Sequence, residues 1–130
     1  MGIAFLKYRD TLPILEVVLK NPDGSVFNLT GSTDWKLHIW LNDGTGTTKL
    51  IRTMTKFGAD AGGTLRYQWI TTDWDVYASA GAVGGLSLTG AWDVEEHRME
   101  YEVIGAGGAR LTFPNGGHDT LRITRDIGQG

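Results

Sequence analysis

Residues 99–123, MEYEVIGAGGARLTFPNGGHDTLRI, decide the fold that this sequence predicts. Apolar and charged side chains alternate from Met99 to Val103, which places every second residue on one face of a β-strand. The three glycines within residues 105–108 can adopt the positive φ of a tight reversal. The Pro-Asn-Gly-Gly run at 114–117 ends the next strand, residues 110–113. We therefore predict a meander of three antiparallel strands, whose apolar face must be covered by a second sheet.

The same period of two recurs along the rest of the chain, most clearly in DWKLHIWLN at 34–42 and TLRYQWI at 64–70. No segment of useful length has a helical period, and about eight short strands at roughly ten-residue spacing predict an all-β, two-sheet antiparallel β-sandwich. The chain is predicted to form one domain, residues 1–130, with one long irregular loop at 79–89. The residues expected in its core are Leu15, Val17, Leu19, Leu37, Ile39, Leu65, Tyr67, Trp69, Tyr101, Val103, Leu111, Phe113, Leu121 and Ile123.

Composition excludes several classes of protein. The formal net charge is −3 and acidic and basic residues are interspersed, so the chain has no electrostatic footprint for binding nucleic acid. No apolar run approaches the ~20 residues of a membrane span, and the first residues lack the basic-then-apolar order of a signal peptide. The chain has no cysteine, which rules out a disulfide framework and a thiolate nucleophile and favours synthesis in a cytoplasm.

The inventory of reactive side chains predicts no catalytic site, no cofactor and no metal. His38 lies on a strand face opposite the core residues, while His97 and His118 adjoin acids or a turn. None of the three has a positioned nucleophile beside it, so we expect solvated or packing roles. The acids in DWD at 73–75 and EEH at 95–97 lack the spacing of a calcium loop or a zinc site, and we expect solvated charges there.

A family resemblance is carried by short blocks that follow one another from residue 10 to residue 123. The blocks are DTLP at 10–13, LEVVLK at 15–20, DG at 23–24, NLTG at 28–31, GTLRYQW at 63–69 followed by Asp73, MEYEV at 99–103, TFPNGG at 112–117 and DTLRI at 119–123. In this order and spacing they resemble the immunoglobulin-like domains of tailed-bacteriophage virion proteins, which are often named after the N-terminal domain of the phage baseplate upper protein. Two segments depart from the family pattern, a longer loop at 79–89 and an extension at 94–98.

The resemblance implies an immunoglobulin-like β-sandwich with a structural role and no chemistry of its own. The protein expected from it is a tail or baseplate component of a phage virion, present in many copies and assembled in the cytoplasm of the bacterial host. Its partners would be other virion proteins, namely tail, baseplate or capsid subunits. A head-decoration or neck protein of the same fold is an alternative, and so is a carbohydrate-binding module used in host attachment.

Five tryptophans in 130 residues are more than a sandwich core usually absorbs. Two of them, Trp35 and Trp69, are in phase with the predicted core faces, whereas the others are out of phase or flank the long loop. Because aromatic side chains supply much of the binding energy of protein interfaces, we predict an interface that contains Trp40, Trp74, Tyr77 and Trp92. Two alternatives stay open: Trp40 covers the second side of its strand within the monomer, or several exposed aromatics in line on one sheet face bind sugar rings.

Overall fold

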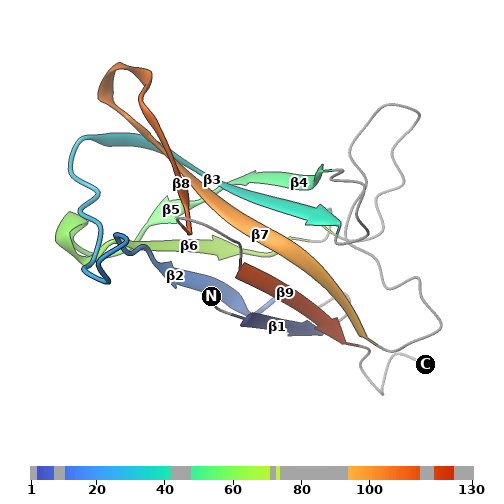
Figure 1. The fold of residues 1–130 in the computed structure, drawn as a ribbon. Helices are drawn as coiled ribbons and strands as arrows, with labels where there is room; N and C mark the ends of the chain where they lie inside the picture. Colours follow the sequence, from blue (N-terminus) through green and yellow to red (C-terminus); the bar gives the residue numbers. More distant parts are fainter. Residues whose placement is uncertain are drawn as a thin grey trace.

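The computed structural model describes residues 3–7, 11–41, 48–70, 73, 94–114 and 119–124, whose regular elements are β-strands and short 3-10 turns (Figure 1). The strands are β1 (Ile3–Lys7), β2 (Ile14–Val18), β3 (Ser32–Leu41), β4 (Thr48–Thr53), β5 (Thr55–Lys56), β6 (Thr64–Gln68), β7 (Val94–Gly105), β8 (Arg110–Phe113) and β9 (Asp119–Thr124). One sheet has six strands in the order β1–β9–β7–β3–β4, with β8 also paired to β7, and the other has three in the order β2–β6–β5. The prediction of an all-β chain with two sheets is confirmed.

Alternation along each strand places one set of side chains between the two sheets. On β3, Leu37 and Ile39 are fully buried and lie opposite Tyr101 and Met99 of β7. Buried apolar side chains from both sheets form a single core, which contains Leu6, Leu15, Leu19, Leu29, Leu37, Ile39, Leu50, Met54, Leu65, Tyr67, Trp69, Met99, Tyr101, Val103, Phe113, Leu121 and Ile123. The predicted core is therefore confirmed at every position except Val17 and Leu111.

These two exceptions lie where one sheet does not cover the other. Leu111 on β8 is 50% exposed, because a sheet of three strands cannot cover the whole inner face of a sheet of six. Val17 is half-buried because β2 is an outermost strand of the smaller sheet, and Val17 lines a groove between β2 and β1.

The predicted meander at the C-terminal end is wrong in its second reversal. The first reversal occurs as predicted: Gly107 and Gly108 have positive φ, and the Gly105 N–H donates to Ala109 O at 2.7 Å. After Phe113, however, the chain does not turn back, because β8 pairs with residues 101–104 of β7 and β9 pairs with residues 94–99. Since β3 occupies one edge of β7, strands β8 and β9 lie end to end along the opposite edge of β7.

The six-stranded sheet is also not purely antiparallel. Strand β1 pairs with β9 in parallel, with Ile3 opposite Thr120 and Lys7 opposite Thr124. The residues of β9 that receive β1 are held in turn by residues 94–98 of β7. The segment that departs from the family pattern as an extension is thus the first part of a long central strand (Figure 1).

Two features of the backbone at position 63 require glycine, a positive φ and a close approach of neighbouring atoms. Its φ is +59°, and a Cβ placed there would lie 2.6 Å from Phe27 O and 2.8 Å from Val26 Cγ1. Gly63 directly precedes β6, and the segments on both sides of the turn at 21–24 lie against it. Phe27 approaches it after the turn, and before the turn the Leu19 N–H donates to Gly63 O at 2.9 Å.

We expect Gly63→Ala to destabilise the fold more than Gly58→Ala in urea-unfolding measurements. Gly58 also has a positive φ, +78°, but a Cβ there would meet no atom within 4 Å. The Gly58 variant therefore measures the cost of the left-handed backbone alone, about 1–2 kcal/mol, and the Gly63 variant adds the clash. Equal losses at the two positions would contradict the close approach of Phe27.

Candidate interaction surface

The face of the six-stranded sheet that points away from the core carries paired polar and aromatic side chains. On β3, Lys36, His38 and Trp40 alternate with buried residues and therefore lie on this outer face. The register of β3 with β7 places opposite them, in the same order, Glu102, Glu100 and Arg98. Each cross-strand pair thus joins a basic residue with an acid or an aromatic ring with a cation, combinations that stabilise neighbouring strands.

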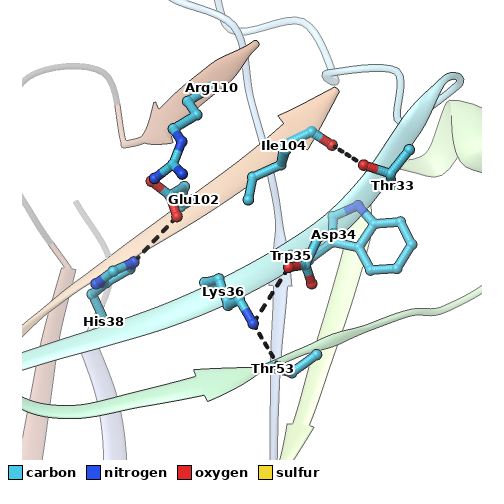
Figure 2. Close-up of polar contacts among 9 residues, drawn as sticks. All are labelled: Thr33, Asp34, Trp35, Lys36, His38, Thr53, Glu102, Ile104 and Arg110. Carbon is cyan, nitrogen blue, oxygen red and sulfur yellow. Dashed lines mark hydrogen bonds and ion pairs between the residues drawn. The ribbon is translucent and has the colours of Figure 1, made fainter. Parts of the chain in front are cut away.

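Figure 2 shows the polar contacts at one end of this outer face. The Nε2 atom of His38 lies 3.5 Å from Glu102 Oε1, and Arg110 Nη1 lies 3.4 Å from Glu102 Oε2. The Nζ atom of Lys36 lies 3.3 Å from Asp34 Oδ2 and donates a hydrogen bond of 3.0 Å to the Thr53 hydroxyl. Because water reaches the Lys36 and Arg110 side chains, the ion pairs of these two residues contribute little to stability. Their charges remain accessible to a partner.

Trp40 lies at the other end of the β3 row and is half-buried. The Arg98 guanidinium lies 5.5 Å from the centre of its ring, within the range of a cation–π contact. The Trp40 Nε1 atom has no hydrogen-bond partner among the residues that the structure describes, although a covered indole N–H usually finds one. The ring therefore covers the second side of β3 within the monomer and stays partly exposed.

A second aromatic–arginine pair lies on the same sheet at β1. Phe5 is 66% exposed, and the Arg122 guanidinium lies 5.6 Å from its ring centre. Arg122 is held in place by Glu96, whose Oε2 atom accepts from Nε at 3.0 Å and from Nη2 at 2.8 Å. The interface prediction did not include these residues. Their alternation signals an outer face, but only the register of β7 with β9 and of β9 with β1 brings Glu96, Arg122 and Phe5 together.

This arrangement does not favour the sugar-binding alternative at Trp40. A sugar platform needs bare aromatic faces in line, whereas Trp40 and Phe5 lie on β3 and β1, which are separated by β7 and β9. Each ring also has an arginine guanidinium close to it. The other predicted interface residues, Trp74, Tyr77 and Trp92, lie outside the described residues, and so does the long loop at 79–89.

Asp73 corrects the expectation of a solvated charge. Its carboxylate is fully buried at the end of β6, where Oδ1 accepts from Arg52 Nε at 2.6 Å. The other oxygen, Oδ2, accepts from the Tyr67 hydroxyl at 2.7 Å and from the Ile70 N–H at 2.9 Å. Burial and the hydrogen bond to Asp73 raise the pKa of the Tyr67 hydroxyl. Desolvation lowers the pKa of Arg52, but the hydrogen bond and charge of Asp73 outweigh it and raise that pKa overall.

The histidines divide into two environments. His38 lies on the outer face as predicted, partly exposed beside Glu102. His97 is buried on β7, opposite Leu121, so of the two expected roles, solvated or packing, the structure supports packing. Alternation explains the burial, because His97 shares its face of β7 with Met99 and Tyr101. His118 lies outside the described residues.

Within the described part of the chain, no group of three or more His, Asp or Glu side chains is arranged to hold a metal ion. The same residues contain no helix that is long and apolar enough to cross a membrane. No protein-family model matches the chain, and a search of curated proteins finds no match.

Proposed function

We propose that this chain is a non-enzymatic structural component of a tailed-bacteriophage particle, with an immunoglobulin-like sandwich that docks on other virion subunits. The tail or baseplate is the favoured location, and the head or neck is the alternative. The observation that carries the proposal is the outer face of the six-stranded sheet, where Trp40 and Arg98 form an accessible aromatic–cation pair among partly exposed charges.

The strand order supports the immunoglobulin-like part of the proposal. In such domains one sheet contains strands A, B, E and D, and the other contains G, F and C, with C′ added in the variable type. Strand β1 departs from this pattern, because it pairs with β9 in the larger sheet. The order β2–β6–β5 corresponds to B, E and D, and β9–β7–β3–β4 corresponds to G, F, C and C′. The split strand formed by β8 and β9 would then be one G strand interrupted at residues 114–118.

The family blocks lie on strands of both sheets. LEVVLK overlaps β2, GTLRYQW overlaps β6, MEYEV lies within β7, and DTLRI lies within β9. The blocks thus supply strands of both sheets instead of clustering in one hairpin, as expected for a resemblance that extends over the fold.

The location is tested by mass spectrometry of purified particles from a phage that encodes this chain, after separation into heads and tails. We expect its peptides in the tail fraction, at more than one copy per particle. Peptides confined to the head fraction would select the decoration or neck alternative. Their absence from purified particles, with the protein present in the infected cell, would refute a structural role.

Replacing Trp40 by alanine is expected to leave the domain folded and to reduce its incorporation into particles. A tryptophan at the centre of an interface contributes about 2 kcal/mol or more to binding, which corresponds to roughly a 30-fold loss of affinity. Incorporation is measured by complementing a gene deletion with the variant and quantifying the protein in purified particles.

Phe57→Ala provides the matched control. Phe57, which is 48% exposed, is likewise an aromatic residue with an arginine against it, since the Arg66 guanidinium lies 3.4 Å from its ring centre. It belongs, however, to the layer of the smaller sheet. We expect this variant to be incorporated like the parent. Normal incorporation of the Trp40 variant, or equal losses for both, would remove the outer face around Trp40 from the docking surface.

A further inference from the structure

Strand β2 has one edge with which none of the described residues pairs. It is an outermost strand of the three-stranded sheet and, among the described residues, pairs only with β6. Strand β1 is likewise outermost in the other sheet, and a groove of about 390 Å³ lies between the two strands, with Ile3, Val17 and Val18 in its walls. An apolar edge strand without covering structure is a template for pairing with another chain.

The exposed apolar residues gather at this side of the sandwich. Of the ten large apolar side chains that are exposed in the described part of the chain, five lie on β1, on β2 or just before β2. They are Ile3, Phe5, Leu12, Ile14 and Val18. The two prolines nearest to the strand, Pro13 and Pro22, lie outside β2 and leave its N–H groups able to pair.

The hydrogen bonds of β2 reveal which of its backbone groups point to the open edge. The Leu19 N–H donates to Gly63 O, so the backbone groups of Leu19 and Val17 face β6. The N–H and C=O groups of Glu16, Val18 and Lys20 consequently point the opposite way, toward the open edge. The side chains of the same three residues are exposed on the outer face.

Charge distinguishes between the two-fold registers in which this edge can pair with a second copy of itself. An antiparallel register centred on Glu16 places Glu16 directly opposite its own symmetry mate, and like charges in that position are destabilising. A register centred on Val18 places Glu16 opposite Lys20 of the second copy, twice because of the symmetry, with the two Val18 side chains in contact. Of these two registers, only the second places opposite charges against each other.

We propose that a second copy of this chain docks on the open edge of β2, antiparallel and centred on Val18, so that two three-stranded sheets become one of six strands. On the outer face, Glu16 of β2 accepts a hydrogen bond of 3.1 Å from Nη2 of Arg66 on the neighbouring strand β6. Docking extends this pair into a row of alternating charge, from Arg66 through Glu16 to Lys20 of the second copy. The inference is independent of the role in a virion.

The absence of cysteine from the chain makes cross-linking a direct test of the register. In the Val18-centred register the two Val18 Cα atoms form a hydrogen-bonded pair about 5.5 Å apart, within the range that a disulfide spans. The two Glu16 Cα atoms would be about 14 Å apart along the strands, too far for a disulfide. Under mild oxidation we expect Val18→Cys to form disulfide-linked dimers at least tenfold faster than Glu16→Cys.

Ile51→Cys serves as the control for random collision. Ile51 is 47% exposed and Val18 is 42% exposed, but Ile51 lies on β4, which is outermost at the opposite end of the larger sheet. Cross-linking of Val18→Cys at the rate of Ile51→Cys would overturn the proposal. Faster cross-linking of Glu16→Cys than of Val18→Cys would overturn the register and the charge argument with it.

Sedimentation of the cysteine-free protein at up to about 1 mM tests the charges without a cross-link, because an edge pairing of this size buries little area and binds weakly. Lys20→Glu is expected to weaken dimerisation by about tenfold, since both charge pairs become repulsive. Adding Glu16→Lys to that variant exchanges the two charges and is expected to restore the dimer. A protein that stays monomeric throughout this range, or a charge exchange that restores nothing, would overturn the proposal.

Discussion

Replacing Ile39 by alanine is expected to lower the free energy of unfolding by about 2–5 kcal/mol. Ile39 is fully buried on β3, a central strand of the larger sheet, and it lies opposite Met99 of β7 and Leu50 of β4, both buried. The shorter side chain loses apolar contacts and leaves a cavity. The neighbouring strands β4 and β7 are held in place by their pairing with β3 and cannot move in to fill it. Urea unfolding followed by tryptophan fluorescence measures the loss.

Ile51→Ala is the matched control, since it makes the same change on the neighbouring strand at a residue that is 47% exposed. Its expected cost is below about 1 kcal/mol, because little apolar area returns to water and no cavity forms. Similar losses at both positions would mean that the two sheets do not close over Ile39.

Asp73→Ala is expected to cost about 3 kcal/mol. The change removes the acceptor of three hydrogen bonds at once, which leaves the Tyr67 hydroxyl, the Ile70 N–H and Arg52 without it. Arg52 is partly exposed and can turn to water, so the larger part of the cost comes from the buried hydroxyl of Tyr67. The loss is measured by urea unfolding of the parent and the variant.

Asp60→Ala tests whether burial is the reason for that cost. Asp60 also accepts from a basic residue at short distance, since Lys56 Nζ lies 2.8 Å from its carboxylate, but both side chains are about one-third exposed. The expected loss is below about 1 kcal/mol. If Asp73→Ala were no more destabilising than Asp60→Ala, the network around Tyr67 would contribute nothing beyond an ordinary surface pair.

Alternation over a few residues was sufficient to predict the strands of the core and the faces that they bury. It worked at β3 and β7 because a period of two has only one arrangement that keeps Leu37, Ile39, Met99 and Tyr101 out of water. The outward position of Trp40 followed from the same rule.

Pairing between distant strands could not be predicted in this way. A proline ends a strand whether the chain then turns back or continues along the same neighbouring strand. Pro114 therefore does not reveal which of the two follows β8. The buried state of Asp73 depends on Arg52 and Tyr67, which lie on different sheets. The contacts of Arg98 and Arg122 likewise depend on the register of neighbouring strands, which local patterns leave open.

The parallel pairing of β1 with β9 determines the order in which the strands of the nascent chain can pair. Thr120 is synthesised more than a hundred residues after Ile3, its neighbour in the sheet. At a translation rate of about 5–20 residues per second, β1 waits on the order of ten seconds for its partner. During that interval the apolar side chain of Leu6 has no native site, because the strand that holds β1 in the sheet has not been made. The larger sheet is therefore completed only after β9 has been synthesised, and a nascent chain must keep β1 unpaired until then.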